Sequence, residues 1–170
     1  DLRMSRGLGD VYKRQTVNYL DKVISEYIST ALATPNLNVN ISQALSSYYL
    51  MLVDIERISD YAVNMNHQAT KRLQGDMTIS EIEIVEHMKK LCVDMKNDLS
   101  DVEEAERKDD VIDSLVSSWR EAQIQALKQQ KCSSEVSMML SRIFTDFERI
   151  NDHALNVSQE FDKINIEIPE

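Results

Sequence analysis

Apolar residues recur along most of the chain at the three- and four-residue spacing of amphipathic α-helices. Five helices are predicted, over about residues 16–33, 42–73, 78–99, 103–131 and 133–163. Pro35 cannot continue a helix, Gly75 is a typical helix stop, and Ser/Thr-x-x-Glu capping patterns begin at Thr78 and Ser100. The fold class is therefore predicted to be all-α, an antiparallel helical bundle.

The same spacing predicts which residues are buried in the core. The first helix is expected to bury Val17, Leu20, Val23, Ile24, Tyr27, Ile28 and Leu32. The third is expected to bury Ile82, Val85, Met88, Leu91, Cys92, Met95 and Leu99, and the fourth Val111, Leu115, Trp119, Ile124 and Leu127. Residues 166–170 are expected to fray, as chain ends do.

One stretch of eleven residues occurs twice. Residues 54–64 read Asp-Ile-Glu-Arg-Ile-Ser-Asp-Tyr-Ala-Val-Asn, and residues 146–156 read Asp-Phe-Glu-Arg-Ile-Asn-Asp-His-Ala-Leu-Asn. The two copies start 92 residues apart and share seven identical positions. A fixed internal period usually marks a repeated supersecondary unit that buries its apolar face against its neighbour. We therefore expect two related halves.

Each copy carries two acidic residues four positions apart, Glu56 with Asp60 and Glu148 with Asp152. This spacing places both carboxylates on one helix face, where like charges repel. Either arginines such as Arg57 and Arg149 pair with neighbouring carboxylates, or a bound cation offsets the repulsion, since hard metals and iron are held by carboxylates on facing helices. The spacing alone leaves both interpretations open.

The repeated Glu-Arg-Ile-x-Asp-x-Ala-x-Asn sequence resembles the PhoU family of bacterial phosphate-uptake regulators. The resemblance implies two three-helix repeats packed side by side, with a Glu/Asp-x-x-x-Asp motif that binds iron or zinc clusters. Residues 113–127 and 131–135 also resemble the PhoU-like cytoplasmic tail of bacterial sodium/phosphate cotransporter-family proteins. The resemblance covers about residues 16–165, and departs from the family at Ser59 and Asn151, where Gly is usual.

This comparison suggests an uneven domain organisation. We expect a truncated first repeat of two helices over residues 16–77 and a complete second repeat of three helices over residues 78–165. The helix missing from the first repeat would lie upstream, which leaves an apolar groove. We expect this groove to be filled in a homodimer, by the leader segment or by a second chain.

Residues 1–15 are expected to be a non-native or disordered leader. They lack apolar periodicity, contain Gly7 and Gly9, and carry a net charge of +2 in a chain whose net charge is −10. The run Asp10-Val-Tyr-Lys-Arg-Gln15 resembles a translated sequencing adaptor, and such segments are excluded from reasoning about the fold.

The second half offers the fuller set of candidate metal ligands. The fourth helix contributes Asp109 and Asp113, again four apart, to face Glu148 and Asp152. In the first half only Glu56 and Asp60 remain, because the matching positions of the first helix are Arg14 and Asn18. The cofactor is expected to be iron or zinc, with other divalent metals still open, and the second site is expected to be the stronger.

Charge and motifs narrow the function classes. A net charge of −10 opposes binding to nucleic acid, whose phosphates require a basic patch. No Gly-rich phosphate loop, nucleophile elbow or zinc-binding His/Cys spacing occurs, and no His has the Glu-x-x-His spacing of di-iron oxidases. An enzyme is therefore not expected.

Cys92 and Cys132 lack Cys-x-x-Cys spacing and are expected to be free thiols in a reducing compartment. His153 lies inside the second motif and is expected to have a packing or surface role.

The sequence is consistent with three functions. The resemblance favours a regulatory domain at the cytoplasmic face of the membrane, in a sodium-dependent phosphate cotransporter-family protein, whose partner is the transporter portion of the parent protein. The alternative is a free-standing PhoU that acts on a phosphate transport and sensor complex. The third is a metal-dependent helical-bundle enzyme.

Overall fold

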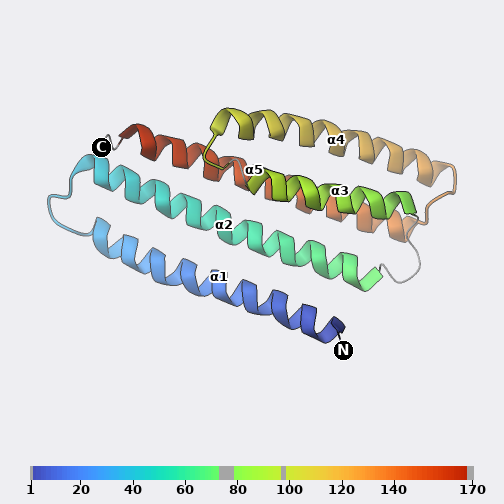
Figure 1. Cartoon of the computed structure of the whole chain (residues 1–170), viewed down its shortest axis with the longest axis horizontal. Helices are drawn as coiled ribbons and strands as arrows, with labels where there is room; N and C mark the ends of the chain where they lie inside the picture. Colours follow the sequence, from blue (N-terminus) through green and yellow to red (C-terminus); the bar gives the residue numbers. More distant parts are fainter. Residues whose placement is uncertain (1, 73–78, 97–98, 168–170) are drawn as a thin grey trace.

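In the computed structural model the chain forms five α-helices that lie alongside one another in an elongated bundle (Figure 1). The helices are α1 (Leu2–Leu32), α2 (Val39–Arg72), α3 (Ile79–Lys96), α4 (Val102–Lys128) and α5 (Ser134–Glu167). The structure describes residues 2–72, 79–96 and 99–167, with side chains described for 12–67, 80–95 and 99–164. No strand occurs in these ranges, so the all-α prediction is confirmed.

Local sequence sets most helix boundaries. Asp101 caps α4, because its side chain accepts a hydrogen bond from the Glu104 backbone N–H at 3.1 Å. Ser133 does the same for α5, since its Oγ accepts from the Val136 N–H at 3.2 Å. After α1, Asn36 takes a left-handed backbone conformation with φ 59°, which Asn tolerates better than most residues. The predicted stop at Gly75 and cap at Thr78 lie outside the described residues.

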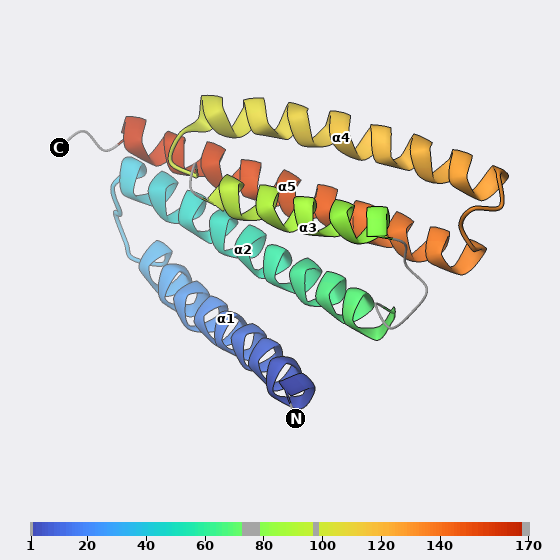
Figure 2. The ribbon, with the colours of Figure 1, turned by 45° about the vertical axis from the view of Figure 1, so that its right-hand side comes forward.

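The centre of the bundle is the seam between α2 and α5, which run antiparallel (Figures 1 and 2). On both helices the buried positions alternate at three- and four-residue spacing, as in coiled coils. Ala44 and Met51 of α2 are buried in one apolar cluster with Val157 and Ile164 of α5. Met65 of α2 is buried in a second cluster with Ile143, Phe147 and Ile150 of α5, against which Ile58 and Tyr61 also pack. This seam joins the two halves of the chain.

The helices α3 and α4 cover the other side of α5. Ile112 and Val116 of α4 and Met88 of α3 are buried in the same apolar cluster as Phe144 and Phe147. The Trp119 ring stacks on the Phe144 ring with centroids 6.1 Å apart. The second half of the chain therefore has a packed core supplied by three of its own helices.

The expected inward face of α4 was partly wrong: Leu115 and Trp119 are half-buried as predicted, but the other three residues are not. Val111, Ile124 and Leu127 are exposed, whereas the buried residues of α4 are Ala105, Ile112, Val116 and Gln123. Apolar residues occur on more than one side of this helix, so the spacing did not fix which side faces α5. On α3, Val85, Met88 and Met95 are buried as predicted, but Ile82 is exposed.

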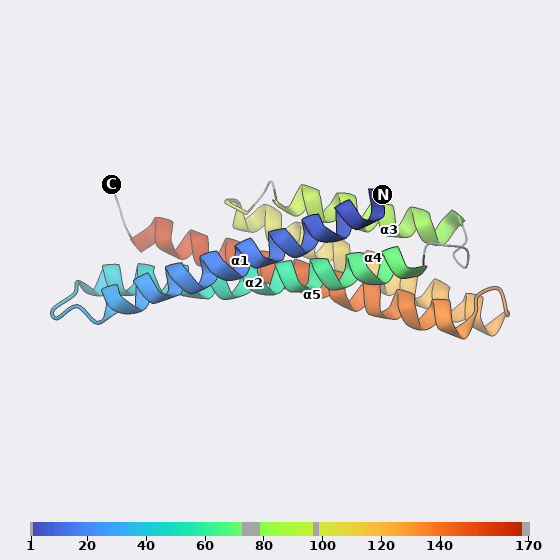
Figure 3. The same ribbon diagram turned by 90° about the horizontal axis from the view of Figure 1, so that it is seen from below.

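The first helix packs on α2 alone among the described elements (Figure 3). Of its seven expected core residues, only Ile28 is buried and Val17 is half-buried; Leu20, Val23, Ile24, Tyr27 and Leu32 are exposed. That prediction was wrong because α1 has a single helical neighbour, which cannot cover so wide an apolar stripe.

The expected start of the first helix also needs correction. Helix α1 begins at Leu2 and not near Thr16, so residues 2–15 of the segment that was expected to be a non-native or disordered leader are helical. Its Arg14 Nε lies 2.7 Å from the Asp60 carboxylate of α2, which ties this part of α1 to the bundle. Two of the described helices precede residue 78 and three follow it. None of the helices in the described ranges is both long and apolar enough to span a bilayer.

Replacement of Phe147 by Ala tests the importance of the α2–α5 seam. Phe147 is fully buried, so Phe147→Ala is expected to lower the free energy of unfolding by about 3–5 kcal/mol through lost burial and the cavity left behind. Chemical denaturation followed by circular dichroism measures the change. The exposed Val93→Ala should change stability by less than about 0.5 kcal/mol. Equal effects of the two substitutions would contradict the assignment of the seam as the core.

Candidate functional site

The structure brings the four predicted carboxylates of the second half to one place between α4 and α5. The pKa of Asp109 is raised to about 6, chiefly by burial and further by the neighbouring carboxylates of Asp113, Asp152 and Asp110. Burial also raises the pKa of Glu148; Asp113 and Asp152 add to this rise, while Arg120 and Arg149 oppose it. These mutual influences show that Asp109, Asp113, Glu148 and Asp152 share one electrostatic environment.

Most of these carboxylates are held by neighbouring donors. The Arg120 Nη2 donates to Glu148 Oε2 at 2.5 Å, across from α4 to α5, and lies 3.2 Å from the Thr145 hydroxyl. The Asn151 side-chain amide donates to Asp109. Arg149 Nη1 lies 3.4 Å from Asp152 Oδ2 on the same helix. The cluster is thus an ion-pair and hydrogen-bond network that links α4 to α5.

The donor set suits a hard or borderline cation, because four carboxylates supply the oxygen ligands that iron and zinc accept in helical bundles. The positions of these side chains are less suited to a metal ion. In the part of the chain that the structure describes, no three or more His, Cys, Asp or Glu side chains form a group placed to hold a metal ion. A cation at this place would compete with Arg120 for Glu148, since both would use the same carboxylate.

The first-half pair is arranged differently. Asp60 pairs with Arg14 of α1 at 2.7 Å, and both side chains are partly exposed. Glu56 lies half-buried on α2, one turn before Asp60. Sequence comparison of the halves had placed Arg14 where the second half has an acidic residue, and the structure shows this arginine next to the remaining acidic pair. A cationic side chain here takes the place that a second acidic ligand pair would need.

Asn151 explains one departure from the family pattern. Its side chain is buried at the position where the PhoU pattern usually has Gly, and its amide donates to Asp109 on the facing helix. The extra bulk therefore fills space between α4 and α5. The hydrogen bond offsets part of the cost of burying the amide, whose Oδ1 has no partner among the described residues.

A second polar contact, which the sequence did not reveal, crosses the seam between the two repeats. His153 Nδ1 of α5 lies 2.7 Å from Asp54 Oδ1 of α2, and both side chains are largely buried. The Tyr61 ring stacks on the His153 ring with centroids 5.8 Å apart. The sequence repeat could have predicted this contact, because Tyr61 and His153 occupy equivalent positions of the two copies and the copies pack antiparallel. His153 therefore has a packing role, as expected, and the contact it makes joins the two repeats.

The repeat equivalent of Asp54 lies in a different environment. Asp146 has one carboxylate oxygen, Oδ2, that is buried and without a hydrogen-bond partner among the described residues. Burial raises the pKa of Asp146, while the positive charge of Arg142 opposes the rise. The two copies of the motif therefore have similar sequences but different electrostatics.

The thiols fit a structural role. Cys92 and Cys132 are both free, and burial raises the pKa of Cys92 to about 12. A thiol with so high a pKa is almost entirely protonated at neutral pH and is a poor nucleophile.

These features define an all-helical domain whose acidic cluster lies between two facing helices. The family model for the PhoU domain matches residues 79–161, which span α3, α4 and most of α5. This segment is therefore similar to a PhoU domain. Comparison of the chain with curated proteins and with solved structures gave no match. The similarity fits a regulatory role in phosphate transport.

The raised pKa of Asp109 predicts a pH-dependent stability difference. The folded state keeps this proton up to about pH 6, whereas the unfolded chain releases it near the ordinary value of 3.8. Stability contributed by this group is therefore present at low pH and is lost as pH rises through this window. Asp109→Asn, which can still accept from Asn151, is expected to be more stable than wild type above pH 6, with the difference vanishing near pH 4.

Urea denaturation of both proteins at several pH values measures this difference. Asp162→Asn, a charge-matched substitution at an exposed position of α5, is the control and should show little pH-dependent difference. An Asp109→Asn protein that is less stable than wild type at neutral pH would show that the ionised carboxylate contributes to folding.

Proposed function

We propose that this chain is a regulatory or accessory PhoU-like domain that acts in phosphate transport and homeostasis. The observation that carries the proposal is the PhoU domain match over residues 79–161, which coincides with the helices that form the packed core and the acidic cluster. A bundle of long helices joined by a charged network is suited to regulation, because a change in the charge of the network alters how the helices pack.

We further propose that the parent protein belongs to the sodium-dependent phosphate cotransporter family, with this domain at the cytoplasmic face of the membrane and the transporter portion as its partner. The support is the resemblance of residues 113–127 and 131–135 to the PhoU-like tail of that family. These residues form the second half of α4 and the α4–α5 turn. A free-standing PhoU that acts on a separate transport and sensor complex is the alternative.

Metal binding belongs to the same proposal. Asp109, Asp113, Glu148 and Asp152 would hold iron or zinc between α4 and α5, and Glu56 with Asp60 would form a weaker site. The mutual influence of the four second-half carboxylates supports this assignment. When bound, a divalent cation would replace arginine as the source of positive charge in the cluster, and Arg120 would have to release Glu148.

The regulatory role predicts a change in phosphate uptake. In the intact parent protein, Glu148→Ala combined with Asp152→Ala is expected to raise phosphate uptake, because PhoU-type regulators restrain transport and these residues join the helices of the regulatory domain. Uptake of labelled phosphate by cells measures the effect, with Asp162→Ala as the exposed-residue control. Unchanged uptake by a stably folded double variant would contradict a regulatory role for this cluster.

The same assay separates the two parents. A cotransporter parent confers sodium-dependent uptake when expressed alone, and the variants change that uptake. A free-standing PhoU confers none, and its variants change uptake only in cells that contain a separate phosphate transporter.

The metal assignment predicts an order of metal content. Elemental analysis after reconstitution with iron(II) or zinc is expected to find bound metal in the wild type. Glu148→Gln with Asp152→Asn should lower the content more than Glu56→Gln with Asp60→Asn, because only the second half offers four acidic ligands. Arg120→Gln should strengthen binding, since it removes the cation that occupies Glu148. Wild-type protein without metal after reconstitution would remove the metal assignment and leave the regulatory proposal standing.

A further inference from the structure

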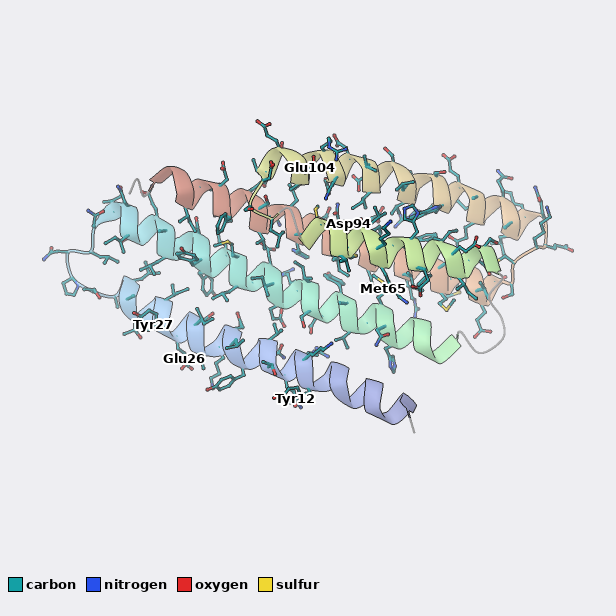
Figure 4. All side chains as sticks on the ribbon, in the orientation of Figure 1. Tyr12, Glu26, Tyr27, Met65, Asp94 and Glu104 are labelled. Atoms are coloured by element: carbon teal, nitrogen blue, oxygen red, sulfur yellow. The ribbon has the colours of Figure 1, made fainter. Side chains whose placement is uncertain are left out.

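Two interhelical ion pairs lie toward opposite edges of the bundle. At one edge Arg120 of α4 donates to Glu148 of α5, and at the other Arg14 of α1 lies 2.7 Å from the Asp60 carboxylate of α2. Figures 1 and 4 show α1 and α4 on opposite sides of α2 and α5. Among the described elements α1 packs on α2 alone, and α4 packs on α5 and α3. A change at one ion pair can therefore reach the other only through the helices between them.

The contact between the two motif copies joins these middle helices. His153 Nδ1 of α5 lies 2.7 Å from Asp54 Oδ1 of α2, and the Asn156 amide of α5 donates to the same oxygen at 3.5 Å. The His153 ring also stacks on the Tyr61 ring of α2. The side chains of His153 and Asp54 are only 13% and 15% exposed. A polar contact in such surroundings is little weakened by competing water, so it fixes the two helices relative to each other.

Each ring of the stack is adjacent in the chain to an acidic residue of one motif copy. His153 follows Asp152, which belongs to the acidic cluster between α4 and α5. Tyr61 follows Asp60, which meets the α1 arginine. Because neighbouring residues of a helix move together, a displacement of Asp152 also moves His153. Packed side chains leave little free space, so the stack passes this displacement to Tyr61 and Asp60.

The sequence repeat would allow a second contact of this kind, which the structure does not form. Exchange of the two copies, 92 residues apart, makes Asp146 equivalent to Asp54 and Tyr61 equivalent to His153. The Tyr61 ring instead stacks on His153, and Asp146 Oδ2 is buried without a hydrogen-bond partner among the described residues. Of the two equivalent places, only one therefore holds a polar contact, and a substitution of one residue is enough to break it.

We propose that His153 couples the two motif copies, so that a change in the acidic cluster between α4 and α5 alters the ion pair between Arg14 and Asp60. His153 acts as a positioning residue, and the ion pairs at the two edges carry the effect. Coupling of this kind is reciprocal, because it is a free energy shared by the two sites. The helix that responds is α1, whose described neighbour is α2 alone. The inference concerns the folded chain and does not depend on the proposed function.

Nuclear magnetic resonance of the Arg14 Nε–H group tests the coupling directly. Arg120→Gln removes the cation at the opposite edge and is expected to shift the Arg14 signal, although α1 and α4 do not touch in the described residues. In a His153→Leu protein the same substitution should leave the signal unchanged, because both the contact with Asp54 and the stack are gone. Tyr61→Leu, which removes the stack from the side of α2, should also abolish the response.

Lys128→Gln is the control. It removes one exposed positive charge from the last turn of α4, the same helix that carries Arg120, and should not shift the Arg14 signal. An Arg14 signal that Arg120→Gln leaves unchanged would overturn the proposal. A response of equal size to Lys128→Gln, or one that persists in both His153→Leu and Tyr61→Leu, would overturn it as well.

A double-mutant cycle provides a second measurement. Arg120→Gln and Arg14→Gln each remove one cation, and the two arginine side chains are 39% and 43% exposed. Unconnected substitutions change the unfolding equilibrium constant independently, to within about twofold. Each ion pair orders its helices, so the second costs less to form once the first is present. The unfolding constant of the double variant, measured in urea, is therefore expected to be about threefold smaller than independent effects predict. Independent effects in the wild-type background would contradict the coupling.

Discussion

The fold depends on the antiparallel packing of α2 against α5. These two helices carry the two copies of the repeated motif, and their buried residues alternate in a coiled-coil rhythm along almost their full lengths. Phe147 and Ile143 of α5 lie in the cluster that also contains α3 and α4, so the seam connects the first half of the chain to the core of the second. Every other element is placed relative to this pair.

The polar residues of the motif are placed by the same seam. Its apolar positions face the partner helix, which leaves Glu148 and Asp152 beside the seam, where they meet α4. Burial there disfavours ionised carboxylates, and Arg120 and Asn151 offset this cost by donating hydrogen bonds. The acidic cluster is thus a polar border of an apolar core, and its sensitivity to protons or cations follows from that position.

The two repeats share a sequence pattern and differ in environment. Asp54 meets His153 across the seam, whereas its equivalent Asp146 has a buried oxygen without a partner among the described residues. The acidic pair of the second repeat faces more carboxylates, and that of the first faces Arg14. Helix cover differs likewise, since α5 is enclosed by three helices while α2 shows an apolar stripe. Repetition of a motif therefore does not repeat its chemistry.

The sequence by itself determined the helical class, the breaks near Pro35 and Ser100, the duplicated motif and the pairing of α4 with α5 carboxylates. Periodicity and capping act over a few residues, so they can be read locally. Tertiary structure decided which of several apolar sides faces inward, as Ile112 in place of Val111 shows on α4, and it left Leu20 and Tyr27 of α1 exposed. It also brought Asp54 to His153 and Arg120 to Glu148. Such contacts join residues far apart in the chain, and only the packing of whole helices fixes their distance.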